Sequence, residues 1–365
     1  MYRQITLRCG CLLVILGMVF LVHAQQPWLP RDPSPAANVS QTVGISTIEV
    51  SYSRPAVKGR QIWGALVPFG WDKQGSVIGL ESPWRAGANE NTVLHLSDPA
   101  MIEGVSVPAG DYGLFFVVNQ DNTGEVILSK DYKSWGSFTY NPKNDQMRAK
   151  INVRDLPAST ERLTYSFDVV DRTTAELDLN WEKKQFPVKI SFAVDDIVMS
   201  NAKGLLNGQT GFLWQNLNAA ADYALSNKVD LDQGLNWANQ AIFTQPSPSM
   251  GPYATKAGIL DLQGKHAEAE KILNDAMATA TENDLNNYGY LLLNNKEYDK
   301  AIAALKINTK KHPDSANTWD SLGEAYALAG DKQNAIVNFK KSLSLNPPAN
   351  VKANSEKYLK LLGAM

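Results

Sequence analysis

The feature that most constrains this chain is a change in the spacing of its apolar residues near residue 200. Before this point apolar and polar residues alternate, as in Leu163–Val169, Ala175–Trp181 and Val188–Val194. Alternation puts successive side chains on opposite faces of a strand, so it predicts antiparallel strands with one face on a core. Later apolar residues recur at helical spacing. We therefore predict an antiparallel β-sandwich or jelly-roll-like domain at 36–197, followed by a helical domain at 205–365.

The helical half contains a repeated unit of about 34 residues, the length of a tetratricopeptide repeat. The marker residues of the last unit are Trp319, Leu322, Gly323, Tyr326, Ala335, Phe339 and Pro347. One unit earlier the same pattern gives Tyr288, Gly289, Leu292, Ala301, Leu305 and Pro313, and two weaker copies precede it. Small residues allow paired helices to approach, and large residues fill the space between pairs. We therefore expect a short α-solenoid of the tetratricopeptide type, capped by a terminal helix at 350–363.

The N-terminal segment predicts export. Residues 1–24 combine Arg3 and Arg8, an apolar run at 9–22, and small or apolar residues before a cut that follows Ala24. This is the arrangement of a secretory signal peptide. The next segment, 25–35, is rich in proline and predicts an extended lead-in. We expect a periplasmic or secreted mature protein without a membrane span, and an uncleaved anchor is the alternative.

Composition limits the classes of function. The chain has 35 basic and 37 acidic residues, a formal net charge of −2, and thus no broad positive field for nucleic acid. It has 2 cysteines and 4 histidines, which disfavours a zinc site or a Cys/His catalytic site. Neither a Gly-x-Ser-x-Gly motif nor a phosphate-binding glycine loop is present. We assign no catalytic residue, metal or cofactor.

Several segments of the strand-rich half, taken in order, resemble one protein family. They are Tyr52–Pro55, Lys58–Arg60, Trp63–Gly70, Trp84–Glu90, Pro108–Tyr112, Trp135–Phe138, and Asp145 with Arg148. They resemble domain of unknown function family 2911, which is found mainly in Bacteroidetes, across about residues 33–195. The resemblance implies no established activity, and some members carry a similar helical tail. Here Trp71–Pro83 is additional, and we expect it to cover or reshape any pocket, with Trp71 as an exposed ring.

The densest polar cluster of this half is the candidate ligand site. Its residues are Arg54, Lys58, Arg60, Trp84, Arg85, Asn89, Glu90, Asp145 and Arg148. Arginine forks suit carboxylate or phosphate, and loop tryptophans can stack on sugar rings, so we predict a small anionic or carbohydrate ligand. One alternative is a set of ion pairs, such as Arg85–Glu90 or Arg148–Asp145, that only fixes loop geometry. Another is a carbohydrate-active or other hydrolase that uses Glu90 and Asp145 as an acid/base pair.

The helical half offers a second candidate surface, the inner face of its first helices. The tetratricopeptide register puts Asn283, Asn286, Tyr290, Asn294, Asn317, Asp320 and Glu324 on this face. Asparagine can bond to the backbone of an extended chain, so we predict a protein partner here. Together the two halves predict an exported binding or scaffold protein of the cell envelope. A purely structural envelope protein is the remaining alternative.

Overall fold

The computed structural model describes residues 33–73, 76–246 and 249–365. The predicted signal peptide and most of the lead-in lie outside these residues. The described chain divides into two units by its internal contacts. One holds the residues through Gln41 together with Thr47–Ser191, and the other holds Thr42–Ser46 with Phe192–Met365. Each unit is described by itself.

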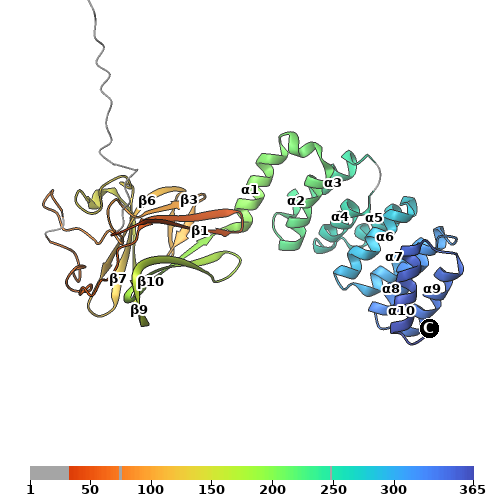
Figure 1. Cartoon of the computed structure of the whole chain (residues 1–365). Helices are drawn as coiled ribbons and strands as arrows, with labels where there is room; N and C mark the ends of the chain where they lie inside the picture. The colour runs from red at the N-terminus through yellow and green to blue at the C-terminus, as the bar shows by residue number, and fades with distance from the viewer. Residues whose placement is uncertain (1–32, 74–75, 247–248) are drawn as a thin grey trace, which may run out of the picture. The chain divides into compact units, whose positions relative to one another are not determined.

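The strand-rich unit is built from two sheets of antiparallel strands, as the alternating pattern predicts (Figure 1). The six-stranded sheet has the order β1-β2-β3-β6-β7-β8, formed by Ala36–Val43, Ser46–Ser53, Val93–Leu96, Gly110–Val118, Thr123–Ser129 and Asp145–Asn152. The four-stranded sheet has the order β5-β4-β10-β9, with β4 at Ala100–Ile102, β5 at Val105–Val107, β9 at Arg154–Val169 and β10 at Thr174–Phe192.

The six-stranded sheet has apolar residues on both faces of β6, which differs from the one-sided core that we expected. Every residue of this strand from Tyr112 to Val118 is buried. Phe115 and Val117 form a second cluster with Ile127 and Tyr140, against which Trp71 packs. The segments around Trp71 and Tyr140 thus cover the outer face of the sheet. This burial explains why β6 has a continuous apolar run rather than an alternating one.

β10 unites two runs that the sequence predicts as separate strands. The register with β9 shifts on both sides of Glu182, whose φ is 51°. A β-bulge of this kind lets one strand continue through a local irregularity. The strand ends at Phe192, and the predicted strand residue Val194 instead begins the first helix. Asp195 and Asp196 lie in the first turn of that helix, where acidic side chains favour an N-terminus.

The second unit contains the helices of a tetratricopeptide-type solenoid (Figure 1). They begin with α1, before the predicted start at residue 205. The α-helices are α1 (Val194–Leu206), α2 (Trp214–Asn227), α3 (Leu231–Thr244), α4 (Met250–Leu262), α5 (His266–Thr279), α6 (Glu282–Asn294), α7 (Tyr298–Lys311), α8 (Ala316–Leu328), α9 (Lys332–Ser344) and α10 (Ala349–Leu361). Helices α2 to α9 pack as consecutive pairs, and α10 contacts both α8 and α9 as the predicted cap.

The small residues of the repeat lie where the paired helices touch. A Cβ added at Gly323 of α8 would stand 2.9 Å from the Phe339 ring of α9. A Cβ added at Gly289 of α6 would stand 2.6 Å from the Leu305 side chain of α7. Phe339 and Leu305 are both 0% exposed. The glycines therefore set the distance between the two helices of each pair, as the repeat pattern predicts.

Candidate functional site

The segment Trp84–Thr92 leaves and rejoins the same neighbouring strand. Trp84 exchanges two backbone hydrogen bonds with Phe116 of β6, at 2.9 Å each. Thr92 then accepts a backbone bond from Leu114, and β3 continues along β6. The residues between these two attachments form a loop that is anchored at both ends. Thr92 Oγ1 and the Tyr165 hydroxyl both donate to the Ala86 carbonyl, which fixes the loop from the core side.

The loop borders a hollow of about 560 Å³ in the strand-rich unit. This volume suits a small organic ligand. Five of the segments that carry the family resemblance contribute to its walls. The lining residues from these segments are Pro55, Lys58, Arg60, Leu66, Pro68, Gly70, Trp84, Arg85, Gly87, Ala88, Asn89, Ser137 and Phe138. Segments far apart in sequence therefore converge on one surface feature.

Arg85 is the central cation of this hollow. Its Nη1 donates to the Asn89 carbonyl at 2.6 Å, and its guanidinium lies 4.9 Å from the centre of the Phe138 ring. It does not pair with Glu90, and the structure places no described carboxylate in an ion pair with it. Burial lowers the pKa of the Arg85 guanidinium, because a desolvated charge is disfavoured. Most of its five N–H donors thus have no bond to the described protein.

Lys58 and Arg60 come from a tight turn beside the hollow. The Arg60 N–H donates to the Val57 carbonyl at 3.0 Å, while Lys58 and Gly59 have φ values of 47° and 67°. Positive φ at both central residues is the geometry of a type I′ turn. The Arg60 guanidinium donates back to the Val57 and Ala56 carbonyls, so it stabilises the turn. The Lys58 ammonium is exposed and lies at the wall of the hollow.

Arg54 and Asn89, two further predicted site residues, fix the scaffold around the hollow. Arg54 does not line the hollow; its guanidinium donates to the Leu163 carbonyl at 3.0 Å and to Thr164 Oγ1 at 2.7 Å. Asn89 lines it, but its side-chain amide donates to the Ser34 carbonyl and to Ser53 Oγ. The alternative in which polar contacts only fix loop geometry therefore describes these two side chains better than direct contact with a ligand does.

Asp145 and Arg148 form the predicted ion pair, outside the hollow. Arg148 Nε donates to Asp145 Oδ2 at 2.5 Å, and the Tyr140 hydroxyl donates to the same carboxylate at 2.8 Å. Burial and the Asp145 carboxylate raise the pKa of Tyr140 above its ordinary value. The Arg148 guanidinium also covers the Trp71 ring at 4.7 Å, so Trp71 is half-buried and not the exposed ring that we expected.

The proposed acid/base pair is not assembled at the hollow. Asp145 is held by Arg148 and Tyr140, and its side chain is 9% exposed. Neither Glu90 nor Asp145 belongs to the residues that line the hollow. The geometry of this site therefore gives the hydrolase alternative no support.

The additional segment Trp71–Pro83 forms part of the wall. Asp72 and Ser82 exchange backbone hydrogen bonds of 2.9 and 3.0 Å, which close the base of the segment. Both residues line the hollow, together with Pro83. The Ser82 hydroxyl and the indole N–H of Trp181, another lining residue, are buried without a hydrogen-bond partner. Neither group can be recognised in the sequence, where alternation identifies Trp181 only as a core residue.

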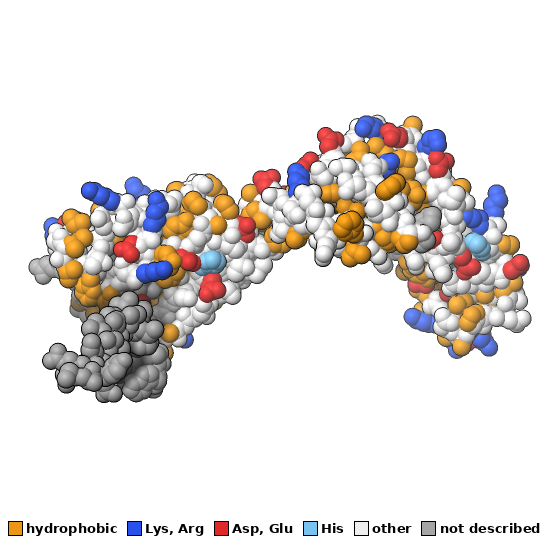
Figure 2. Space-filling view, turned by 90° about the horizontal axis from the view of Figure 1, so that it is seen from above, with side chains coloured by type: hydrophobic (Ala, Val, Ile, Leu, Met, Phe, Trp, Pro, Cys, Tyr) orange, Lys and Arg blue, Asp and Glu red, His pale blue; other side chains and the backbone are white. Residues whose placement is uncertain are grey.

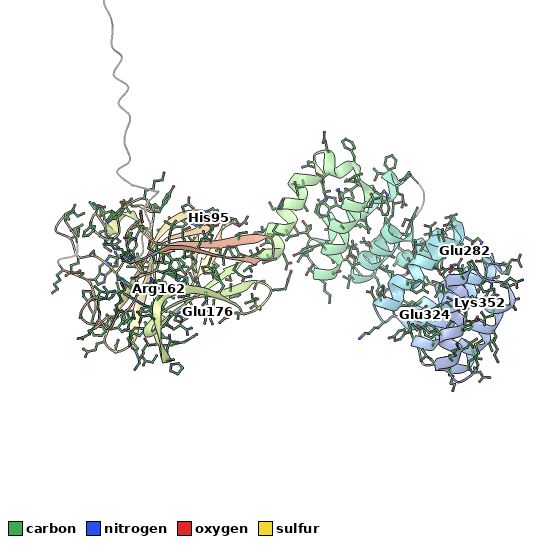
Figure 3. The ribbon with its side chains drawn as sticks, viewed as in Figure 1. His95, Arg162, Glu176, Glu282, Glu324 and Lys352 are labelled. Atoms are coloured by element: carbon green, nitrogen blue, oxygen red, sulfur yellow. The ribbon has the colours of Figure 1, made fainter. Side chains whose placement is uncertain are left out.

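The inner helices hold a polar network that uses three of the predicted partner-binding residues. Glu324 of α8, which is labelled in Figure 3, accepts from the hydroxyls of Tyr290 in α6 and Tyr358 in α10, each at 3.0 Å. Asp320, which is 4% exposed, accepts from Ser355 at 2.5 Å and from an asparagine amide of α10. Burial raises the pKa of the Asp320 carboxyl, and burial with Glu324 raises that of Tyr358 to about 12. These side chains hold the solenoid together.

The predicted asparagines remain available on the first helices of the last pairs. Asn283 and Asn294 of α6 are exposed, and Asn286 and Asn317 are half-buried. The Asn286 side-chain carbonyl is buried without a hydrogen-bond partner. The first helices contact one another in order, α2 with α4, α4 with α6, α6 with α8 and α8 with α10. They thus form a continuous layer on which these asparagines lie.

The surface charge of both units is mixed. Figure 2 shows basic and acidic side chains interspersed on the visible faces. Among the residues that the structure describes, no cluster of three or more His, Cys, Asp or Glu residues could hold a metal ion. Within the described ranges, no helix has the length and apolar character needed to cross a membrane.

Two family models match parts of the chain. Residues 34–190 match the family described as "Protein of unknown function (DUF2911)", and residues 316–348 match the tetratricopeptide repeat. The second match covers the pair α8 and α9. Both resemblances that the sequence suggested are thus confirmed. A comparison with curated proteins gave no match.

Several solved structures have some likeness to part of the chain. The MamA crystal structure is 19% identical, covers 42% of this chain and 89% of its own, and has a TM-score of 0.24. The structure of YrrB, described as a tetratricopeptide protein with an unusual peptide-binding site, is 13% identical over 45% of this chain and 84% of its own, with a TM-score of 0.25. A tetratricopeptide protein from Parabacteroides merdae is 20% identical, covers 43% of this chain and 61% of its own, and also has a TM-score of 0.25.

Proposed function

We propose that this chain, whose strand-rich half belongs to the family described as "Protein of unknown function (DUF2911)", is an exported binding protein of the cell envelope. In this proposal the strand-rich unit binds a small anionic ligand, and the helical unit binds a protein partner. Tetratricopeptide arrays form extended surfaces that bind other proteins, which supports the second part. The observation that carries the first part is the hollow, where the family's segments meet around Arg85.

The anion-binding part depends on the environment of Arg85. A half-buried guanidinium without a carboxylate partner is costly, and an anion in the hollow would offset that cost. Lys58 adds a second positive charge at the wall. The bonds of Arg54 and Asn89 to neighbouring strands keep this wall in place without a ligand.

The test is thermal unfolding of the purified protein in the presence of small anions. We expect acetate, glucuronate or inorganic phosphate to raise the melting temperature of the strand-rich unit, because ligands of the folded state stabilise it. Arg85→Gln should abolish the rise, whereas Lys150→Gln, an exposed cation of β8, should preserve it. No rise with any anion, or an equal rise in Arg85→Gln, would refute the anion site.

The partner-binding part is favoured by the exposed side chains of Asn283 and Asn294 on the layer of first helices. Each amide can donate to and accept from the backbone of an extended partner. We expect the double variant Asn283→Ala and Asn294→Ala to lose a partner that crosslinks to α6 in the wild-type protein in cells. Mass spectrometry maps the crosslinked residues in the wild type and in the variant. Partner contacts confined to the strand-rich unit, or unchanged in the variant, would contradict the proposal.

Export rests on the segment 1–24, which lies outside the described residues. We expect the protein recovered from the periplasm or medium to begin at Gln25, as determined by N-terminal mass spectrometry. A cytoplasmic protein that retains residues 1–24 would contradict export.

A further inference from the structure

The walls of the hollow define the ligand more closely than its charge alone. Both charged and apolar residues form the lining. The apolar residues are Leu66, Pro68, Trp84, Phe116, Val118 and Phe138. The cations of the lining are Lys58, Arg60 and Arg85. Arg60 is bonded to backbone carbonyls, and Asp72 is the one acid among the described lining residues. A ligand that complements both kinds of residue carries a negative group and an apolar body.

The donors of Arg85 point to the negative group. Within the described protein its guanidinium donates one hydrogen bond, from Nη1 to the Asn89 carbonyl. The other donors form a planar fork, which matches the two oxygens of a carboxylate. The exposed Lys58 adds a second cation to the wall. These two cations favour a ligand with an anionic end.

Exposed apolar side chains gather in the loops that build the hollow. Most apolar side chains of a folded protein are covered, so a group of exposed ones marks a binding surface. The exposed residues of the loops between 64 and 83 and between 131 and 140 are Leu66, Phe69, Val77, Ile78, Leu80, Trp135 and Phe138. Val77 lies against the second loop, because its N–H donates to the Phe138 carbonyl at 2.8 Å. Leu66 and Phe138 belong both to this group and to the lining.

A carbohydrate fits these walls poorly. Sugar hydroxyls need many side-chain partners, but Ser137 already donates to the Pro83 carbonyl and Asn89 to Ser34 and Ser53. The Trp84 ring is stacked on Trp181 at 5.7 Å, so this face of the indole cannot receive a sugar ring. Two neutral polar side chains of the lining and one face of the Trp84 ring are therefore already engaged within the protein.

We propose that the hollow binds an amphipathic monocarboxylate, whose carboxylate pairs with Arg85 and Lys58 and whose acyl chain or ring contacts Leu66 and Phe138. This proposal rests on the anion site proposed above and selects one class of anion for it. A straight-chain acid and an aromatic acid both combine a carboxylate with an apolar body, so both fit this description.

The test measures dissociation constants of the full chain for octanoate, phenylacetate, acetate, octanol and glucuronate by isothermal titration calorimetry. We expect octanoate or phenylacetate to bind at least tenfold more tightly than acetate, and octanol to bind more weakly than octanoate. If octanoate binds more tightly than phenylacetate, the apolar body is a chain, and if phenylacetate binds more tightly, it is a ring. Glucuronate binding as tight as octanoate, or octanoate no tighter than acetate, overturns the amphipathic ligand while the anion site stands.

Variants separate the two ends of the ligand. Leu66→Ser should raise the dissociation constant for octanoate severalfold without changing that for acetate, and because Leu66 is 48% exposed we expect the variant to fold. Val169→Ser, which changes a 64% exposed side chain outside the lining, is the matched control. Arg85→Lys keeps the charge but loses the fork, and we expect it to weaken both acids about tenfold. No binding of any anion to the wild type overturns this proposal together with the anion site.

Discussion

Asp178 is a buried acid on which the stability of the strand-rich unit should depend in a defined direction. It lies in β10 opposite Ser166 of β9, between the core residues Leu177 and Leu179. Its side chain points to the other face, is 2% exposed, and has one carboxyl oxygen without a hydrogen-bond partner. Burial, then the neighbouring charge of Glu176, raise the pKa of Asp178 to about 6. Arg154 opposes this effect and Asp168 adds to it.

The sign and size of the effect follow from linkage. A pKa of about 6 in the folded chain, against about 3.9 in an unfolded chain, means that the folded state binds the proton more tightly. The contribution of this pKa shift to the free energy of unfolding is fully present below pH ~3.9, and it is lost as the pH rises through about 6. Two pKa units correspond to roughly 3 kcal/mol. Asp178→Asn keeps the shape and removes the charge, so its advantage over the wild type should grow by about that amount between pH 4 and pH 8.

Urea unfolding at several pH values measures this difference. Tryptophan fluorescence follows the strand-rich unit through Trp181 in the same strand, and the two units require separate transitions in the fit. Glu81→Gln, which removes an exposed carboxyl of the same unit, should leave the pH dependence unchanged. A stability difference between Asp178→Asn and wild type that does not vary with pH would refute the reasoning.

Two further predictions concern the helical unit. Gly289→Ala should lower the free energy of unfolding of the helical unit by about 1–3 kcal/mol, because the new Cβ meets Leu305 at 2.6 Å. Gly204→Ala in α1 is the control. Its new Cβ meets nothing within 4 Å, so it should raise the same free energy by up to ~1 kcal/mol. Circular dichroism during urea unfolding compares them, and equal effects would contradict the packing argument. Ser355→Ala removes a donor to the buried Asp320, so we expect a loss of about 1–2 kcal/mol in the same assay, and no loss would show that the bond is unimportant.

Local patterns predicted the architecture because they follow from the period of each element. Alternation in 163–169 and 175–181 found β9 and β10, and the spacing of Gly323, Ala335 and Phe339 found α8 and α9. The β10 bulge was missed, since an irregularity at Glu182 depends on the register with another strand. The start of α1 was missed because Val194 fits both the end of an alternating run and the first turn of a helix.

The candidate site was only partly predictable, for a different physical reason. Residue type and loop setting were enough to select Lys58, Arg60, Trp84 and Arg85, all of which line the hollow. They could not decide which polar side chains would be used up by bonds across the fold, as happens to Arg54 and Glu324. Nor could they reveal the unpaired Trp181 donor, which depends on what fails to lie near it.

The attachment of the loop 85–91 to β6 at both ends has a consequence for how this fold can change. Backbone bonds at Phe116 and Leu114 hold the sheet in register whatever lies between them. Replacements of the half-buried residues within 85–91 that keep the buried Ala86 and its bonds would therefore change the lining of the hollow while the strands keep their partners. New ligand preferences can arise at such positions without a new fold.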